Sequence, residues 1–198
     1  MPDHAPHKDS ERKSEATVSC RASTDKSYIG SITSVEIFWS GFSPPIMFII
    51  DWGDGSSETH MSPFSSGSRK YLHRYASPGD FEVKVTVKEY SGVKGHASTK
   101  ISIVPPPTAT LEIQPKSGVA PLTIKLSAKV ENGIEPIDWI LDLGDGSTPL
   151  AGSGRNISVS HTYYSLGKYV VTLEVQDKNG KNAQAIAEVI IEGSEKKD

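Results

Sequence analysis

Four aspartates stand at matching places in two copies of one short loop, and their spacing is the first feature that could do chemistry. Asp51 and Asp54 lie in DWGDG, and Asp142 and Asp145 lie in DLGDG. Two carboxylates in one loop supply oxygen ligands of the kind that calcium prefers. Calcium takes about six to eight oxygens, however, and neither loop has the dense Asp, Asn and Glu spacing of a dedicated calcium loop. A calcium site is therefore the lesser alternative.

The same loops contain the residues that a tight turn requires. Glycine takes a positive φ at no steric cost, and each loop has two glycines: Gly53 and Gly55, then Gly144 and Gly146. Asp54 and Asp145 can accept hydrogen bonds from nearby backbone amides. A determinant of the fold must recur in each copy of the fold, whereas an active site need not. The duplication therefore favours a structural role for all four aspartates.

A histidine follows each loop and raises the question of a catalytic triad. His73 precedes Tyr75 by two residues, and His161 precedes Tyr163 in the same way. No serine lies in a recognisable nucleophile setting such as Gly-x-Ser-x-Gly. Alternation buries each tyrosine ring, whose hydroxyl then bonds the backbone, and lets the histidine bond the acidic loop. We predict a structural motif here, with no catalytic residue and no cofactor.

The segments that must position these residues alternate apolar and polar side chains. They include residues 34–40, 81–90 and 97–104 in the first half, and residues 122–130 and 168–177 in the second. Period-two alternation of β-branched and aromatic residues indicates strands with one buried face. Glycine, proline, serine and aspartate fill the segments between them, as turns require, and no stretch has a sustained helical period. The predicted fold class is all-β.

The pattern occurs twice, which predicts two domains. PIMFIIDWGDGS aligns with PIDWILDLGDGS, and HRYASPGDFEVKVTV aligns with HTYYSLGKYVVTLEV. Two units of this size and strand density indicate two small β-sandwiches in series. The predicted parts are a flexible polar arm at residues 1–15, a first sandwich at 16–104, a proline linker at 105–107, a second sandwich at 108–192 and a polar tail at 193–198.

Together these motifs resemble the polycystic kidney disease (PKD) domain. The resemblance rests on an acidic GDG loop, a His-x-Tyr step, a turn glycine, an aromatic residue and an alternating strand, in that order. It covers nearly all of residues 16–192, and it implies two immunoglobulin-like β-sandwiches of the PKD type in tandem. PKD-like modules as a family are associated with extracellular contact with proteins or polysaccharides, so the resemblance implies partners of these classes.

Composition argues against several other classes of partner and site. The chain of 198 residues has a formal net charge of −3, which argues against a generic binder of nucleic acid or anionic membranes. Its single cysteine, Cys20, excludes an intramolecular disulfide framework and any multi-cysteine metal site. No stretch approaches the roughly 20 apolar residues that span a bilayer, and the N-terminus has no secretory signal. We expect no nucleic-acid partner and no membrane insertion.

One loop of the first unit, HMSPFSSGSRKY, carries an aromatic residue that the second unit lacks. Phe64 stands there among serines and a glycine, with Arg69 and Lys70 close by. Binding contacts are often carried on such loops. Phe64, Arg69 and Lys70 are therefore the candidate contact with a partner.

Two functions follow as expectations. The first is a non-catalytic structural or adhesive surface protein, such as a capsid-decorating or tail-associated protein of a bacteriophage, because modules of an extracellular type begin here at Met1 without a signal. Its partner would be a capsid or other virion protein, and its location the virion surface. The alternative is an accessory pair of modules, excised from a larger secreted enzyme or cell-surface protein, that binds protein or polysaccharide outside the cell.

Overall fold

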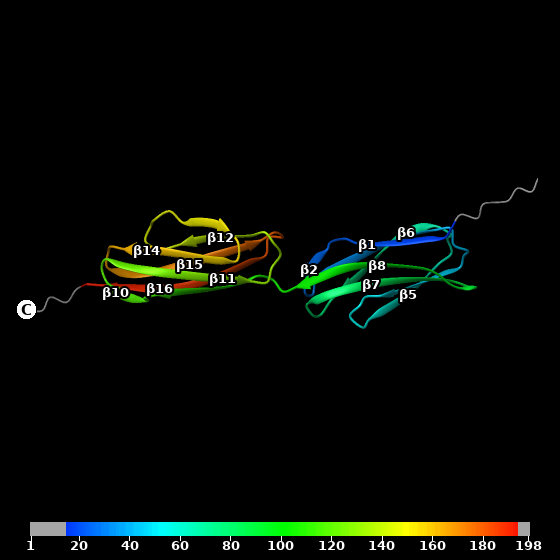
Figure 1. Cartoon of the computed structure of the whole chain (residues 1–198), viewed down its shortest axis with the longest axis horizontal. Helices are drawn as coiled ribbons and strands as arrows, with labels where there is room; N and C mark the ends of the chain where they lie inside the picture. The colour runs from blue at the N-terminus through cyan, green and yellow to red at the C-terminus, as the bar shows by residue number, and fades with distance from the viewer. Residues whose placement is uncertain (1–14, 194–198) are drawn as a thin grey trace, which may run out of the picture. The chain divides into compact units, whose positions relative to one another are not determined.

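The computed structural model describes residues 15–193, apart from the side chains at positions 93 and 94. The predicted N-terminal arm and C-terminal tail lie almost wholly outside the described residues. The chain divides into two compact units, Met1–Ile103 and Val104–Asp198. All regular structure in the described residues is β-strand (Figure 1), so the prediction of an all-β protein is confirmed. Residues 15–193 therefore contain no helix long and apolar enough to cross a membrane.

Unit 1 consists of a three-stranded and a five-stranded sheet. The first sheet has the strand order β1-β3-β6, and the second has the order β2-β8-β7-β4-β5. The strands are β1 (Thr17–Ala22), β2 (Lys26–Tyr28), β3 (Ile32–Ser40), β4 (Ile46–Asp51), β5 (Ser57–Ser62), β6 (Gly67–Arg74), β7 (Gly79–Glu89) and β8 (Gly92–Val104).

Unit 2 repeats this arrangement strand for strand. Its sheets have the orders β14-β11-β9 and β10-β16-β15-β12-β13. The strands are β9 (Thr108–Gln114), β10 (Ser117–Val119), β11 (Leu122–Glu131), β12 (Ile137–Asp142), β13 (Leu150–Ser153), β14 (Asn156–Tyr163), β15 (Gly167–Asp177) and β16 (Asn182–Glu192). Each strand of unit 1 has its counterpart eight strands later, so the predicted tandem of two sandwiches is confirmed.

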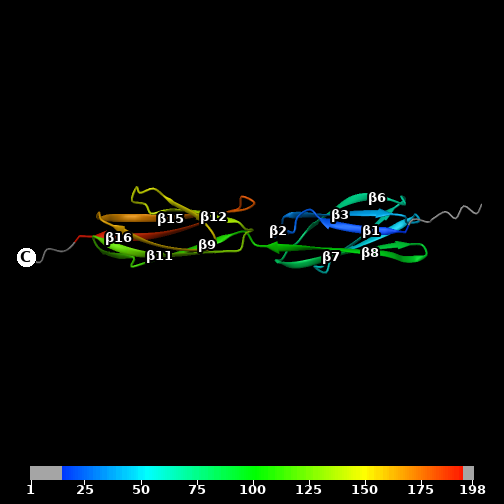
Figure 2. The same cartoon turned by 45° about the horizontal axis from the view of Figure 1, so that its top comes forward.

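The two sheets of each unit pack face to face on a core of their own (Figure 2). In unit 1 the core joins Val35 and Ile37 of β3 to Val83 and Val85 of β7, all at most 1% exposed. Alternation explains this burial, because every second residue of a strand faces the same side of its sheet. Each such side chain stabilises the fold by about 1.5–3 kcal/mol relative to an exposed position.

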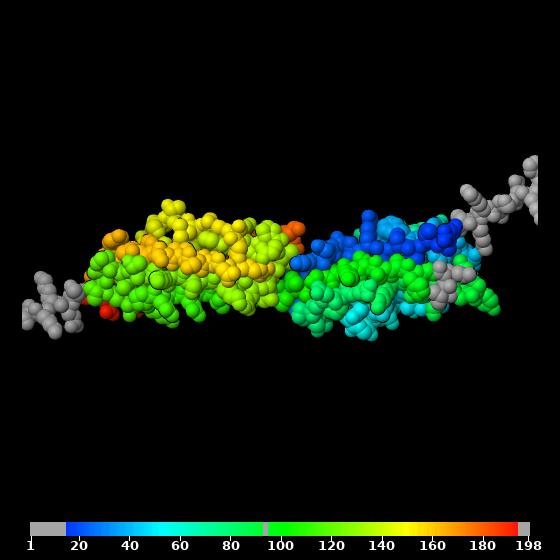
Figure 3. Space-filling view, in the orientation of Figure 1, coloured from blue at the N-terminus to red at the C-terminus, as the bar shows by residue number. Residues whose placement is uncertain are grey.

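The first strand region of each unit serves both sheets and closes one side of the sandwich. β1 pairs with β3, whereas β2 joins β8 in the other sheet. Figure 3 shows β1 in blue beside β8 in green, and Val18 of β1 reaches the backbone of β8 at Gly95. In unit 2, β9 pairs with β11 and β10 pairs in parallel with β16. The two sheets are therefore linked through these strands, which leaves β5 and β6, and likewise β13 and β14, as the outer strands on the opposite side.

The turn after β12 lies against the neighbouring strand β15 and requires glycine at one position. Gly144 has φ +76°, and a Cβ there would overlap the carbonyl oxygen of Val170. Gly146 has a similar φ of +81°, but no atom lies within 4 Å of its Cβ position. Unit 1 repeats the close approach, since a Cβ on Gly53 would lie 2.8 Å from the carbonyl oxygen of Glu82. Only the first glycine of each loop is held by packing as well as by backbone conformation.

Substitution of Gly144 and of Gly146 separates the cost of the close packing from the cost of the positive φ. Gly146→Ala should lower the free energy of unfolding of unit 2 by about 1 kcal/mol, the cost of a left-handed conformation for a residue with a Cβ. Gly144→Ala should lower it by about 3 kcal/mol, because the new Cβ also displaces the backbone of β15. Calorimetry of the full chain measures both, and equal losses in the two variants would contradict the close approach.

Candidate functional site

The loop of unit 2 is a hydrogen-bonded turn that ends β12. The Oδ1 atom of Asp142 accepts a hydrogen bond from the backbone amide of Gly144 at 2.8 Å. The Oδ1 atom of Asp145 accepts one from the backbone amide of Ser147 at 3.0 Å. Each carboxylate therefore holds the amide two residues ahead, which is the Asx-turn pattern of hydrogen bonding.

The loop of unit 1 has the same bonds at the same places. Asp51 Oδ1 accepts from the Gly53 amide at 2.9 Å, and Asp54 Oδ1 accepts from the Ser56 amide at 3.0 Å. The Ser56 hydroxyl adds a bond of 2.6 Å to the same oxygen of Asp54. The four aspartates that the sequence singled out thus bond the turns in which they lie.

A histidine from the adjoining sheet meets the second aspartate of each loop. Nε2 of His161, on β14, lies 2.7 Å from Oδ2 of Asp145, and Nε2 of His73, on β6, lies 2.7 Å from Oδ2 of Asp54. All four side chains are between 15% and 22% exposed. The histidine therefore connects the three-stranded sheet to the turn that leaves the five-stranded sheet.

These contacts favour the ionised form of both carboxyl groups. Hydrogen bonding from Ser147, helped by His161, lowers the pKa of Asp145 to about 2. Burial acts to raise the pKa of Asp54, but hydrogen bonds from its serine and its histidine outweigh that effect, and the pKa lies below its usual value. Hydrogen bonds to the charged form account for both directions.

A buried tyrosine in each unit ties the loop to the core. Tyr75 and Tyr163 are each 1% exposed. The Tyr75 hydroxyl donates to the carbonyl oxygen of Trp52 at 3.0 Å, and the Tyr163 hydroxyl donates to that of Leu143 at 2.8 Å. Burial raises the pKa of both phenols to about 12. Each hydroxyl therefore keeps the proton that it donates to the loop.

The two copies differ in the ring system around the histidine. In unit 1, His73 stacks on Trp52 with ring centroids 4.6 Å apart and meets the edge of Tyr75, also at 4.6 Å. In unit 2, His161 has the same edge contact with Tyr163 at 4.7 Å, but Leu143 stands in place of the tryptophan. The bond between histidine and aspartate and the bond from tyrosine to the loop carbonyl are thus common to both copies. The stacking of histidine on tryptophan occurs only in unit 1.

The arrangement lacks the connections that a triad needs. A nucleophile would have to bond the imidazole that activates it, but the Ser56 hydroxyl bonds the carboxylate of Asp54 instead. Within residues 15–193, no three His, Cys, Asp or Glu side chains gather as a metal-ion ligand set. Calcium binding by Asp51, Asp54, Asp142 and Asp145 stays a prediction, and no contact in residues 15–193 adds support to it.

The three residues predicted to contact a partner do not share one surface. Phe64 lies in the loop before β6 with its side chain 67% exposed. Arg69 and Lys70 are neighbours on β6 and so point to opposite faces of the sheet. The Arg69 guanidinium lies over the Tyr71 ring, 5.5 Å from its centroid, whereas Lys70 lies beside Glu36 on the solvent face.

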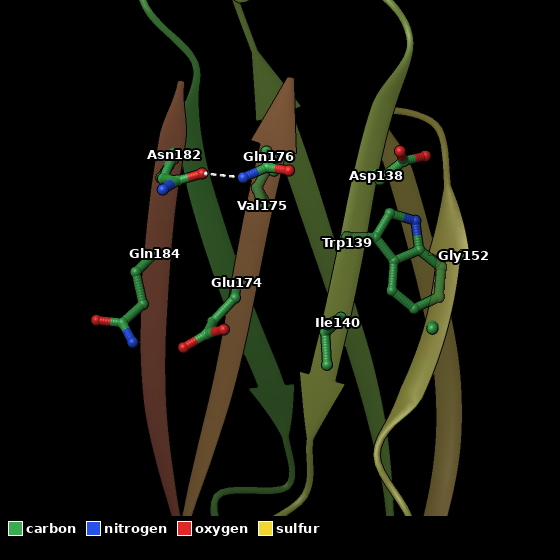
Figure 4. A pocket seen from close by; sticks show the side chains of 11 residues that line it. Asp138, Trp139, Ile140, Gly152, Glu174, Val175, Gln176, Asn182 and Gln184 are labelled. Carbon is green, nitrogen blue, oxygen red and sulfur yellow. Dashed lines mark hydrogen bonds between the residues drawn. The ribbon is translucent and has the colours of Figure 1, made fainter. Parts of the chain in front are cut away.

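One surface feature was missed from the sequence. A hollow of about 740 Å³ lies over β12, β15 and β16 of unit 2, with Asp138, Ile140 and Glu174 among its lining residues (Figure 4). Alternation predicts that these side chains are exposed. Their grouping depends on the register between strands far apart in the chain, for which no local sequence signal exists.

Removal of the loop carboxylate tests its structural role. Asp145→Ala should lower the free energy of unfolding of unit 2 by about 1–3 kcal/mol, because the Ser147 amide and His161 lose their acceptor. The melting temperature should fall by roughly 5–15 °C for a unit of this size. Asp138→Ala, at an exposed aspartate of β12, is the matched control and should change little. An unchanged melting temperature in Asp145→Ala would exclude the turn role.

The lowered pKa of Asp145 makes its contribution depend on pH. The pKa is about 2 in the folded chain and about 3.9 in an unfolded one. The carboxylate therefore stabilises the fold above about pH 4, and this contribution is lost as the pH falls through about 2. Solvent screening limits it to about 1 kcal/mol. The melting temperatures of the wild type and Asp145→Asn should converge between these pH values, and a constant difference would contradict the assignment.

Comparison with known proteins shows which domains this chain is similar to. The sequence model of the PKD domain matches residues 108–190, and no curated protein matches the chain. The PKD domain of an M14-like peptidase from a Thermoplasmatales archaeon is 25% identical, with 43% of this chain and 95% of that domain covered and a TM-score of 0.35.

Two multi-domain structures resemble the chain in fold alone. The ectodomain of mouse nectin-like molecule 4 is 13% identical with a TM-score of 0.50, and 93% of this chain is covered. An I-band fragment of titin is 12% identical with a TM-score of 0.51, and 88% is covered. The chain spans 66% of each of these structures. The second unit is therefore similar to the PKD domain over residues 108–190, and the chain is a tandem of two immunoglobulin-like sandwiches with the same strand order and the same acidic loop.

Proposed function

We propose that this chain is a non-catalytic binding or adhesive protein in which the two sandwiches are rigid supports for surface contacts. One observation carries the proposal: in both copies the aspartate, histidine and tyrosine of the conspicuous motif bond one another or the backbone. Such bonds hold the fold together, and each histidine of the motif is bonded to a carboxylate rather than to a serine or cysteine nucleophile. PKD and immunoglobulin-like domains are typically modules of this kind.

The place of action proposed is outside the cell or on the surface of a particle. PKD domains are typically extracellular, and modules of this class generally bind proteins or carbohydrates. A location on a bacteriophage virion and an accessory role beside a secreted enzyme are two forms of this proposal. In the first form the chain is attached to a phage particle, and in the second it is part of a longer secreted protein.

Fractionation decides between these forms. Cells that produce the protein, their culture supernatant and any phage particles are separated on a density gradient, and each fraction is probed with an antibody. A fixed copy ratio in the particle fraction supports a virion surface protein. Recovery in the supernatant or cell envelope as part of a longer chain supports an accessory module. Recovery only as a free cytoplasmic protein would contradict both.

Phe64 is the residue that we propose makes the contact in unit 1. Its backbone is anchored, because its amide bonds the Ser62 hydroxyl and its carbonyl oxygen accepts from Nε1 of Trp39 at 3.2 Å. Its ring nevertheless lies in solvent. An exposed aromatic ring on an ordered backbone can bind at a small cost in conformational entropy.

Substitution of Phe64 tests this contact. Phe64→Ala should weaken binding of the purified chain to the particle or envelope fraction about tenfold or more, with an unchanged melting temperature. Tyr164→Ala, which removes an exposed aromatic ring from a loop of unit 2, is the matched control. If both variants bind as tightly as the wild type, Phe64 does not make the contact.

A further inference from the structure

The solvent face of the five-stranded sheet in unit 2 is hollowed and acidic. The hollow seen in Figure 4 is lined by Asp138 and Ile140 of β12, Glu174 and Gln176 of β15, and Asn182 and Gln184 of β16. Its lining has two carboxylates and no lysine or arginine. Gln176 donates to Asn182 at 3.1 Å, which orders that end of the hollow. We call this surface the acidic face.

Aliphatic side chains are exposed on the acidic face. Ile140 is 50% exposed and Ile186, two residues beyond Gln184 on β16, is 58% exposed. Along β12 the outward positions read Asp138, Ile140 and Asp142, an aliphatic residue between two acids. Successive outward residues of a strand lie roughly 7 Å apart. Exposed aliphatic groups framed by charge are a common feature of protein interaction sites.

The solvent face of the three-stranded sheet in unit 1 carries the opposite charge. Along β6 the outward positions read Lys70, Leu72 and Arg74, an aliphatic residue between two bases at the same spacing. Leu72 is 59% exposed, and Ile32, paired with Arg74 across the sheet, is 60% exposed. We call this surface the basic face.

The charge balance of the basic face is positive. Among the outward positions of β1, β3 and β6 stand three basic residues, Arg21, Lys70 and Arg74, and one acid, Glu36. Arg21 bonds Glu36 at 2.7 Å and lies over the Phe38 ring, 5.0 Å from its centroid. The Arg21–Glu36 pair is neutral, so Lys70 and Arg74 give this face a net positive charge.

We propose that the acidic face of one copy of this chain binds the basic face of a second copy. An acid–aliphatic–acid row on β12 and a base–aliphatic–base row on β6 are alike in spacing and in the exposure of the aliphatic residue, and they are opposite in charge. Contact would pair Asp138 and Asp142 with Lys70 and Arg74 and would bury Leu72 against Ile140. Opposite charges steer such an encounter and fix its register, and buried aliphatic surface adds affinity.

The contact should be weak and sensitive to salt. Each face is small and open, so the dissociation constant should be on the order of 10–100 µM. Exposed charges are screened over about 10 Å at 0.1 M salt and about 3 Å at 1 M. Sedimentation velocity of the full chain at low salt should show association that rises with concentration, and about 1 M salt should weaken it about tenfold or more.

Charge reversal on either face tests the pairing. Asp138→Lys/Glu174→Lys reverses the acidic face, and Lys70→Glu/Arg74→Glu reverses the basic face. Each variant alone should stay monomeric up to several hundred micromolar. A 1:1 mixture should associate again, because the first variant keeps a native basic face and the second keeps a native acidic face. Lys100→Glu, on the other sheet of unit 1, is the control and should associate as the wild type does.

The outcomes separate this proposal from its alternatives. Arg74 also donates to the carbonyl oxygen of Gly30, so Lys70→Glu/Leu72→Asp replaces the second variant if that one fails to fold. A wild type that stays monomeric at every concentration, reversal without effect, or a mixture that stays monomeric would each overturn the proposal. None of these results bears on binding through Phe64, which is measured on a different fraction and with a different variant.

Discussion

The hydrogen bond from a buried tyrosine hydroxyl to the carbonyl just before Gly-Asp-Gly is the constraint on which each loop depends. A hydroxyl buried as deeply as that of Tyr163 must find an acceptor, and it donates to the carbonyl oxygen of Leu143 at 2.8 Å. This bond holds the loop down on the end of the sandwich. Gly144 then lies so close to β15 that a side chain has no room, and Asp145 is brought to within 2.7 Å of His161. The requirement for glycine at position 144 and the contact between Asp145 and His161 thus both depend on this one anchored carbonyl.

Comparison of the two copies shows which parts of the motif are interchangeable. Trp52 and Leu143 differ in size and in polarity, yet both present the same carbonyl to the tyrosine. In unit 1 the tryptophan also stacks on the histidine, and its Nε1 donates to Glu58 at 3.3 Å. Backbone geometry is therefore conserved between the copies, whereas the side chain at this position varies with the local packing. A motif used in this way positions a turn.

Much of the fold could be predicted from the sequence because alternation and turn chemistry are local signals. The strand with Phe81, Val83 and Val85 inward is an example, since period-two burial can be recognised without knowing which strands lie beside it. Register is not local. The opposite directions of Arg69 and Lys70 follow from the same alternation, and so does the contact of Arg69 with Tyr71, two residues along the same strand. The neighbour of Lys70, Glu36, depends on pairing between β3 and β6. The hollow near Glu174 likewise requires three strands in register and has no signature within any one of them.

The outward positions of a sandwich are free of the packing rules that govern the inward ones, so charge can vary there without loss of the fold. In this chain the base–aliphatic–base row stands on a three-stranded sheet, and the acid–aliphatic–acid row stands on a five-stranded one. A contact between them joins two different surfaces, so every copy offers one acidic and one basic face to its neighbours. Two copies that occupy each other's faces form a closed dimer, whereas a head-to-tail contact forms a larger ring or an open chain. The size of the assembly in sedimentation therefore reports which of these geometries the contact has.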